Sequence, residues 1–393
     1  MSLEAPEQTE VAPPRLREVA AFFLKLGTIA FGGPAAHVGI MEDELVRRRK
    51  WLAAEEFLDL FAVANLLPGP SSTELAIFIG YRLRGVAGLL LAGTCFILPA
   101  FLIVAGLAWA YVRYGSLPAA VGILYGVKPV VIAIVVQALW RLSGSAVKTR
   151  TLAVLGFLAL LASFVGINPL PVLIGAGAVT AMIYSWNHHP APRNPAAVLL
   201  PAIPLAATSV AVPTLGGIFG VFLKMGCVVF GSGYVLLAFL QADLVTSRHW
   251  LTGGQLIDAV AIGQVTPGPV FTTATFIGYL LAGPKGAVAA TVGIFAPAFV
   301  FVACAGPVVR RLRTSQFARA LLDGFNVAAL ALMAFVTWAL ARAALLKPDG
   351  RLDGIALGVG LISAILLLRF KINSTWLIAL GAGIGIAAIW VRK

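Results

Sequence analysis

Residues 22–33 read FFLKLGTIAFGG and residues 221–232 read VFLKMGCVVFGS, and the two stretches align at one offset (224 − 25 = 199). The same offset joins the Pro-Gly-Pro motifs at 68–70 and 267–269. After a gap of one residue, an offset of 198 continues as far as Trp140 and Trp338. A register kept over this distance indicates an internal duplication, which many secondary transporters carry.

The composition excludes a soluble protein. Of the 393 residues, 60% are hydrophobic and 11% are charged, whereas soluble domains are about 25% charged. Stretches such as 86–112, 120–140, 286–309 and 321–346 are long enough to span a bilayer. Strand alternation is absent. We therefore predict an all-α polytopic membrane protein with roughly 10–12 hydrophobic segments in two homologous halves.

The repeat sets the expected organisation. Two segments can be re-entrant and need not cross the membrane fully. They are 57–80, which Pro-Gly-Pro interrupts, and the proline-rich 197–212. The predicted units are a polar N-terminal tail (1–18), a first repeat (19–186), a linker that can include a short membrane segment (187–214) and a second repeat (215–393).

Loop charge predicts how the halves are oriented. Loop 41–51 is strongly basic, but its counterpart 240–250 has one arginine. Loop 112–118 has one arginine, but its counterpart 310–319 has four. Because basic loops stay on the cytoplasmic side, this exchange favours inverted repeats with broken or re-entrant helices.

The net charge of +13 is attributed to the same topology rule, so no nucleic acid partner is expected. The three cysteines lie singly in apolar runs, which argues against a disulfide framework, a zinc site and a thiol-based reductase. Phosphate-loop, hydrolase and metalloprotease motifs are absent. We therefore expect a transporter without a cofactor, and not an enzyme.

Helix-breaking residues recur at apolar depth in both halves. They are Gly32 and Gly33 with their relatives Gly231 and Ser232, and the motifs Pro68-Gly69-Pro70 and Pro267-Gly268-Pro269. Glycine and proline weaken a helix there, and matching breaks in two halves are typical of a transporter binding site. A tight turn at the membrane surface is the alternative reading of each motif taken alone.

Hydroxyl residues follow each Pro-Gly-Pro motif. They are Ser71, Ser72 and Thr73 in the first half, and Thr272 and Thr273 in the second. We expect them to cap half-helices, whose free N–H groups and positive dipole ends would face a small oxyanion.

Two lysines of the repeat lie within apolar segments. Lys25 and Lys224 are candidates for anion binding, because an ionisable group in a spanning segment is costly. Lys25 lies close to the polar tail, so it can also reach the headgroups as an ordinary snorkelling side chain.

Further candidates for gating or coupling have no counterpart of the same type in the other half. Lys128 can line a transport path on one side only. Glu74 can take up a proton, or pair with Arg82 or Arg84, and we favour pairing. His37 can act as a pH-sensitive gate, although a hydrogen-bonded interfacial role is favoured. Asp59 and Asp258 do recur, and the simplest reading makes them helix-start acids.

These motifs resemble those of the chromate ion transporter family in its two-domain form. The first half carries FLKLGTIAFGGPAAH, RRRKWL and NLLPGPSSTELAIFIGYRLRG, and the second carries FLKMGCVVFGSGYVLLAFL and GQVTPGPVFTTATFIGYLLAGPKGA. The resemblance covers nearly the whole chain outside the tail. It implies that Phe31–Pro34, both Pro-Gly-Pro motifs, Lys25 and Arg82 matter for function. Gly231-Ser232-Gly233 lacks the family's proline, so the halves are not equivalent.

The resemblance implies a bacterial inner-membrane protein that exports chromate and confers resistance, with sulfate as a competitor. We expect membrane potential or a proton gradient to drive this export. The alternatives are a transporter of sulfate or another oxyanion, and a non-transporting membrane sensor or subunit. Membrane lipid is an expected partner, and a homodimer remains open.

Overall fold

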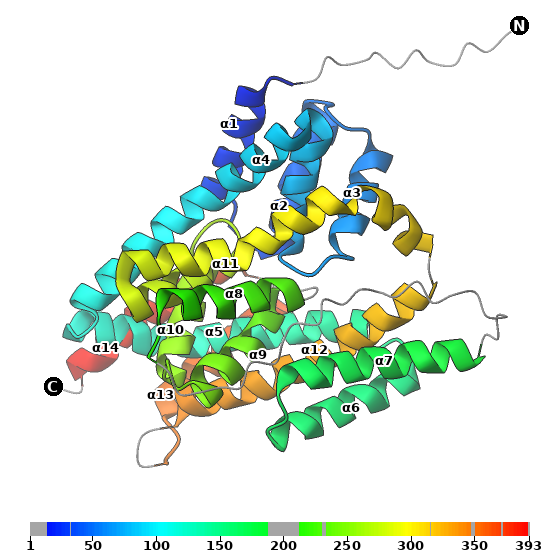
Figure 1. Ribbon diagram of the computed structural model, residues 1–393. Helices are drawn as coiled ribbons and strands as arrows, with labels where there is room; N and C mark the ends of the chain where they lie inside the picture. Colours follow the sequence, from blue (N-terminus) through cyan, green and yellow to red (C-terminus); the bar gives the residue numbers. More distant parts are fainter. Residues whose placement is uncertain are drawn as a thin grey trace, which may run out of the picture.

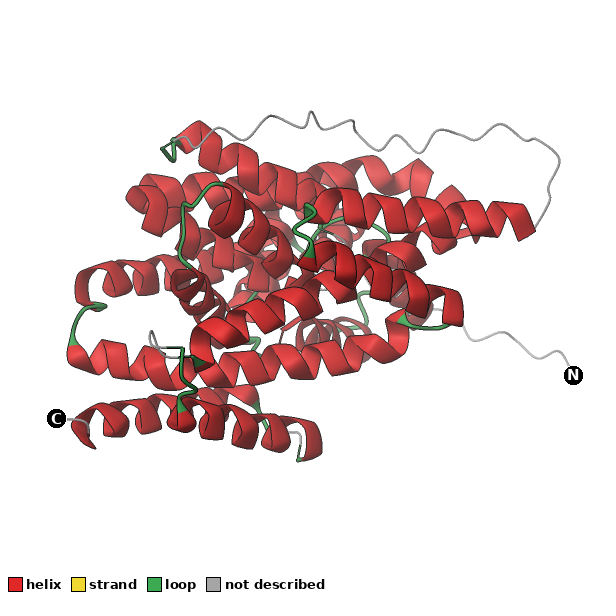
Figure 2. Cartoon of the chain, turned by 90° about the horizontal axis from the view of Figure 1, so that it is seen from below, coloured by secondary structure: helices red, strands yellow, loops and turns green. Residues whose placement is uncertain are grey.

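A computed structural model describes residues 14–31, 33–187, 212–229, 233–314, 316–346, 350–370 and 372–391. Most of the N-terminal tail, most of the linker with all but the last residue of the segment 197–212, and Gly32, Gly231 and Ser232 lie outside the described residues. The described chain is a bundle of helices with no strand (Figure 2). This confirms the predicted all-α class.

The elements occur in matching order in the two halves (Figure 1). Even a rare backbone conformation recurs. Lys50 (φ 52°) and His249 (φ 53°) both have positive φ, and each lies just after a short π-helical segment. The first half contains α1 (Leu16–Ile29), α2 (Gly33–Glu42), η1 (Asp43–Arg48), α3 (Ala54–Ala64), α4 (Ser71–Tyr114), α5 (Pro118–Ala146), α6 (Arg150–Phe164) and α7 (Pro169–Asn187). The second contains α8 (Leu215–Val228), η2 (Gly233–Val235), α9 (Leu236–Leu240), η3 (Gln241–Ser247), α10 (Gly253–Val265), η4 (Val270–Thr272), α11 (Thr273–Thr314), α12 (Gln316–Leu345), α13 (Gly354–Arg369) and α14 (Ser374–Val391).

The helices are apolar enough for a multi-pass membrane protein. Among the described residues, five helices are long enough to cross a bilayer and five more are shorter and apolar, which agrees with the predicted number of segments. Large apolar side chains are exposed on their outer faces, including Trp140, Trp186 and Trp376. In water such a surface would be strongly unfavourable, and in lipid it is not.

The two longest helices, α4 and α11, fold back on themselves. The backbones of Gly80 and Gly88 touch, although eight residues of straight helix would separate them by about 12 Å. The turn occurs at Arg84 and Gly85, and Gly85 has φ 60°. Helix α11 repeats this turn at Ala282-Gly283. The segment predicted at 57–80 therefore consists of α3, the Pro-Gly-Pro loop and the first arm of α4.

Helices of one half pack against helices of the other half. Helix α5 packs mainly on α13 and α14, while α12 packs mainly on α6 and α7. Backbones approach closely in both places, because Gly126 meets Gly381 and Gly177 meets Gly324. Small residues allow membrane helices to pack at such short range. Helices α4 and α11 also contact each other, so neither half forms a separate bundle.

Candidate anion site at two broken helices

The first helix of each half ends where the glycine motif begins. Helix α1 stops at Ile29, and Ala30 is extended (ψ 94°). Helix α8 stops at Val228, and Val229 is extended (ψ 109°). The carbonyl groups of Ala30 and Val229 are thereby released from the helical pattern, and they require partners from elsewhere in the protein.

The Pro-Gly-Pro loops supply these partners across the halves. The backbone N–H of Gly69 donates to the Val229 carbonyl over 2.7 Å, and that of Gly268 donates to the Ala30 carbonyl over 3.1 Å. Both glycines have positive φ, 138° and 89°. Each loop of one half thus closes the helix break of the other, and the predicted motifs meet in one region.

The hydroxyl residues after these loops do not cap helices, so that part of the prediction is wrong. Pro70 precedes the first turn of α4, and no side chain caps it. The hydroxyls of Thr272 and Thr273 donate back to the carbonyls of Pro269 and Val270. Because the short loop already bends the backbone, the hydroxyls lie inside the turn. Ser71, Ser72, Thr73, Thr272 and Thr273 are buried beside the breaks.

His37 connects several of these elements. Its Nε2 lies 3.2 Å from the Ala30 carbonyl and its Nδ1 lies 3.1 Å from Ser72 Oγ. Because a carbonyl only accepts, Nε2 carries the proton and Ser72 donates to Nδ1. Helix α2 has ten residues and is not among the spanning helices. Burial lowers the pKa of His37 to about 4. His37 is therefore a neutral, hydrogen-bonded side chain in this structure, as favoured above, but it lies in the interior.

Glu74 is the most unusual side chain beside the Pro-Gly-Pro loop of the first half. It is 0% exposed, and among the described residues neither of its carboxyl oxygens has a hydrogen-bond partner. The favoured pairing with Arg82 or Arg84 is wrong. Arg82 instead forms an ion pair with Glu56 on α3. Eight residues along α4 separate Glu74 from Arg82, so the arginine lies more than two turns away from the buried end of the helix.

The repeated lysines have different surroundings. Lys25 is exposed, as the snorkelling alternative requires. Lys224 is half-buried and forms an ion pair with Asp243 of η3, which is 4% exposed. Sequence reasoning missed Asp243. The offset of 199 could have found it, since Asp243 aligns with Glu44, whose carboxylate pairs with Arg49 at 2.8 Å.

Lys128 does not lie free along a path. Its Nζ is 3.2 Å from Asp258 Oδ1, and Tyr111 donates its hydroxyl to Asp258 Oδ2 over 2.9 Å. Asp258 lies inside α10, whose N-terminus Thr252 caps, so the helix-start reading of this acid is wrong. Asp59, its repeat partner, is exposed on α3. The three groups join α5, α10 and the end of α4, and so hold the halves together.

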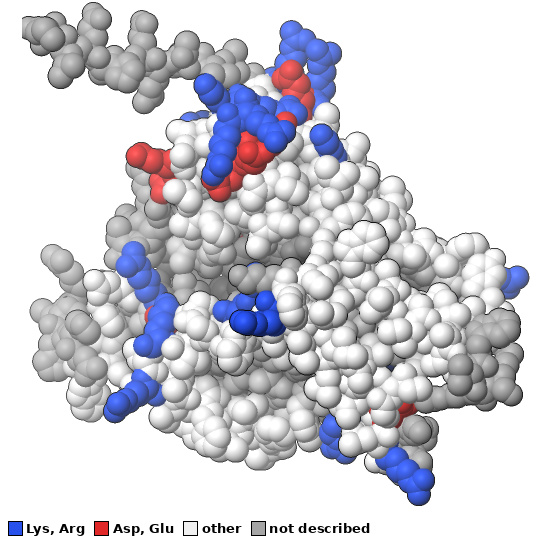
Figure 3. All heavy atoms as spheres, turned by 180° about the vertical axis from the view of Figure 1, so that it is seen from behind, with Lys and Arg blue, Asp and Glu red and all other residues white. Residues whose placement is uncertain are grey.

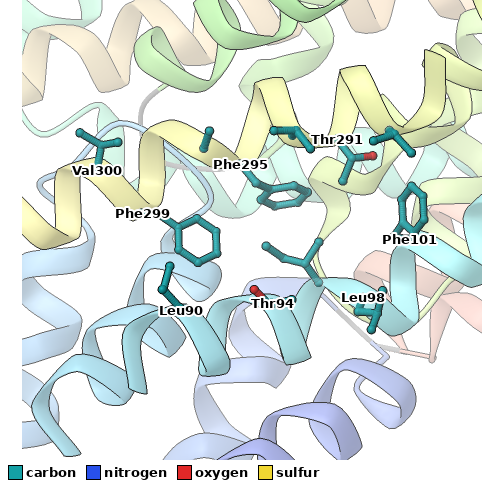
Figure 4. A pocket seen from close by; sticks show the side chains of 12 residues that line it. Leu90, Thr94, Leu98, Phe101, Thr291, Phe295, Phe299 and Val300 are labelled. Atoms are coloured by element: carbon teal, nitrogen blue, oxygen red, sulfur yellow. The ribbon is translucent and has the colours of Figure 1, made fainter. Parts of the chain in front are cut away.

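Surface charge and an apolar groove lie apart from these pairs. Acidic residues 42–44 pair with Arg47, Arg48 and Arg49 along α2 and η1, and Figure 3 shows clusters of both signs at the upper end of the molecule. A groove of about 560 Å³ runs between α4 and α11. Leu90, Phe101, Phe295 and Phe299 line it (Figure 4). An apolar groove of this kind suits lipid chains better than an oxyanion.

The fold and the site define a polytopic membrane transport protein: broken helices at matching positions in two halves meet at a buried polar region. The chain belongs to the chromate transporter family, whose profile matches residues 17–182 and 216–386. No solved structure matches it.

Three curated relatives are similar over most of their length. The chromate transport protein of Cupriavidus metallidurans is 35% identical over 382 residues, which cover 95% of this chain and 93% of the relative. The probable chromate transport protein of Synechococcus elongatus is 34% identical over 84% of this chain and 86% of its own. The chromate transport protein of Pseudomonas aeruginosa is 34% identical over 85% of this chain and 83% of its own.

Proposed function

We propose that this protein exports chromate, a divalent tetrahedral oxyanion, from the cytoplasm across a bacterial inner membrane. The family and the names of the relatives support chromate as the transported ion. The observation that carries the proposal is the crossed pair of hydrogen bonds, Gly69 to Val229 and Gly268 to Ala30. These bonds bring both helix breaks and the N-terminal ends of α4 and α11 together.

The physical reason for an anion is the polarity of these helix ends. The first turns of α4 and α11 begin at the Pro-Gly-Pro loops, and a helix N-terminus carries about half a positive charge. Substrate-binding roles are proposed for Gly32, Gly33, Gly231, Ser232, residues 68–73, residues 267–269, Thr272 and Thr273. Half-buried Lys224 and Lys128 add positive charge near the second half's short helices.

Both lysines are already neutralised by carboxylates, which affects how an anion would bind. Asp243 and Asp258 are buried beside Lys224 and Lys128. A dianion that approaches either lysine competes with a fixed carboxylate. Such a site would bind its substrate weakly enough to release it, which transport requires.

Membrane potential is the proposed driving force. Moving one charge through 100 mV releases about 2.3 kcal/mol. Export of a dianion from a cell whose interior is negative by 100 mV is therefore favourable by about 4.6 kcal/mol. Coupling to a proton gradient is the second candidate, which the unpaired carboxyl of Glu74 favours. Sulfate is the alternative substrate, because it shares the charge and the tetrahedral shape of chromate. A non-transporting sensor or subunit is the least supported reading.

The test is uptake of radiolabelled chromate into inverted membrane vesicles that contain the protein, with and without an imposed potential. Uptake above that of empty vesicles, increased by a potential positive inside the vesicle, supports electrogenic export. Excess unlabelled sulfate measures competition. Absence of uptake by protein shown to be folded would overturn the chromate assignment, and uptake of labelled sulfate alone would replace it with the alternative.

A further inference from the structure

The carboxyl group of Glu74 lies in the first turn of α4, against the loop that closes the second break. A Cβ placed on Gly69 would lie 2.6 Å from Glu74 Oε1. Glu74 is fully buried, and within the described residues both of its carboxyl oxygens and the hydroxyl of the preceding Thr73 lack a hydrogen-bond partner. An ionised carboxylate in such a place is strongly unfavourable, so the group is held in its neutral, protonated form.

Charged groups on the helices packed against α4 are exposed or paired elsewhere, as far as the structure describes their side chains. His37 of α2 lies in the same region, because it bonds to Ser72 in the same turn of α4. On the remaining elements, Arg15, Arg17, Glu18 and Lys25 of α1, Glu55 and Asp59 of α3 and Lys285 of α11 are exposed, Glu56 of α3 pairs with Arg82, and Asp258 of α10 pairs with Lys128. Within the described part of the chain, no cation contacts Glu74 to stabilise its ionised form.

The second half has no corresponding acid. At the offset of 198, Glu74 aligns with Thr272, and at the offset of 199 His37 aligns with Leu236. Both titratable groups therefore belong to the first half alone. The shared arrangement of the two loops does not require a carboxyl group, since the loop of the second half donates the reciprocal hydrogen bond, from Gly268 to Ala30, without one.

We propose that Glu74 is a proton-binding site whose neutral form is required for an anion to bind beside the first turn of α4. This rests on the proposed function, because it assumes that the anion binds at the start of α4. An ionised Glu74 in that turn would repel a dianion at short range and in low dielectric. When the carboxyl is exposed to water, it releases its proton and the site loses affinity for the anion.

Linkage gives the proposal a measurable sign. If anion binding requires a protonated carboxyl, a bound anion must also favour protonation to the same extent. The KM for the anion should therefore rise with pH once Glu74 ionises in the anion-free protein. For one linked proton the rise is roughly tenfold for each pH unit above that ionisation.

The deciding variant is Glu74→Gln, which is neutral at every pH and has nearly the same shape. We expect it to transport chromate in inverted vesicles with a KM that no longer rises between mildly acidic and alkaline pH. Glu55→Gln is the matched control, because it removes an exposed glutamate from the neighbouring α3. The control should keep the pH dependence of the wild type.

A second measurement uses the wild type alone. Purified protein in a weakly buffered solution at alkaline pH should take up protons when chromate is added, and the Glu74→Gln variant should not. If the wild type transports chromate with a pH-independent KM and takes up no protons, the inference is wrong while the proposed function stands. A folded Glu74→Gln variant that is inactive, or that keeps the wild-type pH profile, also overturns the inference. Failure of the wild type to transport chromate at any pH overturns the proposed function and the inference with it.

Discussion

Gly69 donates its backbone N–H to the carbonyl of Val229, which lies 160 residues further along the chain (229 − 69 = 160) and ends the first helix of the other half. The reciprocal bond runs from Gly268 to Ala30, so the pair relates the two breaks to each other. A change in one break is thereby transmitted to the loop of the other half. Such coupling between halves is what alternating access requires.

The first prediction concerns these two glycines. Gly69→Ala and Gly268→Ala should each abolish most transport, since both positions have positive φ and a Cβ would lie 2.6 Å from Glu74 Oε1 or 2.8 Å from Ala100 Cβ. We expect each variant to be destabilised by about 1–3 kcal/mol. Gly39→Ala, at an exposed position of α2 where a Cβ meets nothing within 4 Å, is the control and should retain transport. Vesicle uptake and thermal unfolding in detergent measure both effects.

The second prediction concerns the buried ion pair of Lys224 and Asp243. Replacing either residue alone by alanine should cost about 3–5 kcal/mol, because a charge remains buried without its partner. The double variant should cost clearly less than the sum of the two. A double-mutant cycle from chemical unfolding in detergent gives the coupling energy. Lys25→Ala, at the exposed repeat position, should change stability by about 0.5 kcal/mol or less; additive single effects for the pair would contradict the structure.

The third prediction separates the parts of the Lys128, Asp258 and Tyr111 cluster. Tyr111→Phe removes one hydrogen bond to a carboxylate but keeps the edge-on ring contact with Phe276, at 5.2 Å between centroids. It should cost about 1.5–3 kcal/mol. Lys128→Met should cost more, since Asp258 then loses its cation. Equal thermal stability of the two variants would show that the ion pair does not hold the halves together.

The fourth prediction concerns the acid stability of the wild type. The pKa of His37 is about 4 in the folded protein, below its ordinary value of 6.5, because the side chain is buried. The unfolded chain therefore binds a proton more readily, and stability is lost as the pH falls from about 6.5 towards 4. The full contribution is about 3 kcal/mol, at 1.36 kcal/mol per pH unit.

The His37→Gln variant tests this origin. It should lose less stability than the wild type over the same pH interval, as measured by unfolding in detergent at a series of pH values. An identical loss in both proteins would mean that another group causes the acid sensitivity.

Sequence reasoning could predict much of the fold. The offset of 199 predicted a duplication, and the structure repeats even the turn at Gly85 in the second half at Gly283. Apolar length predicted the number of segments, and glycine and proline predicted where helices end. These features depend on local backbone preferences and on transfer to lipid, which the identity of neighbouring residues largely fixes.

Pairing across the fold was decided by tertiary structure. Sequence reasoning favoured pairing of Glu74 with Arg82 or Arg84. Packing against α3 instead pairs Arg82 with Glu56, and Glu74 is buried without a hydrogen-bond partner among the described residues. Asp258 was read as a helix-start acid, although α5 carries Lys128 to it. Side chains far apart in the chain meet only when helices pack, and local propensity carries no information about which ones meet. The sequence alone thus determined a duplicated membrane protein with two helix breaks, and only the packing of its helices decided that each break is closed by the other half.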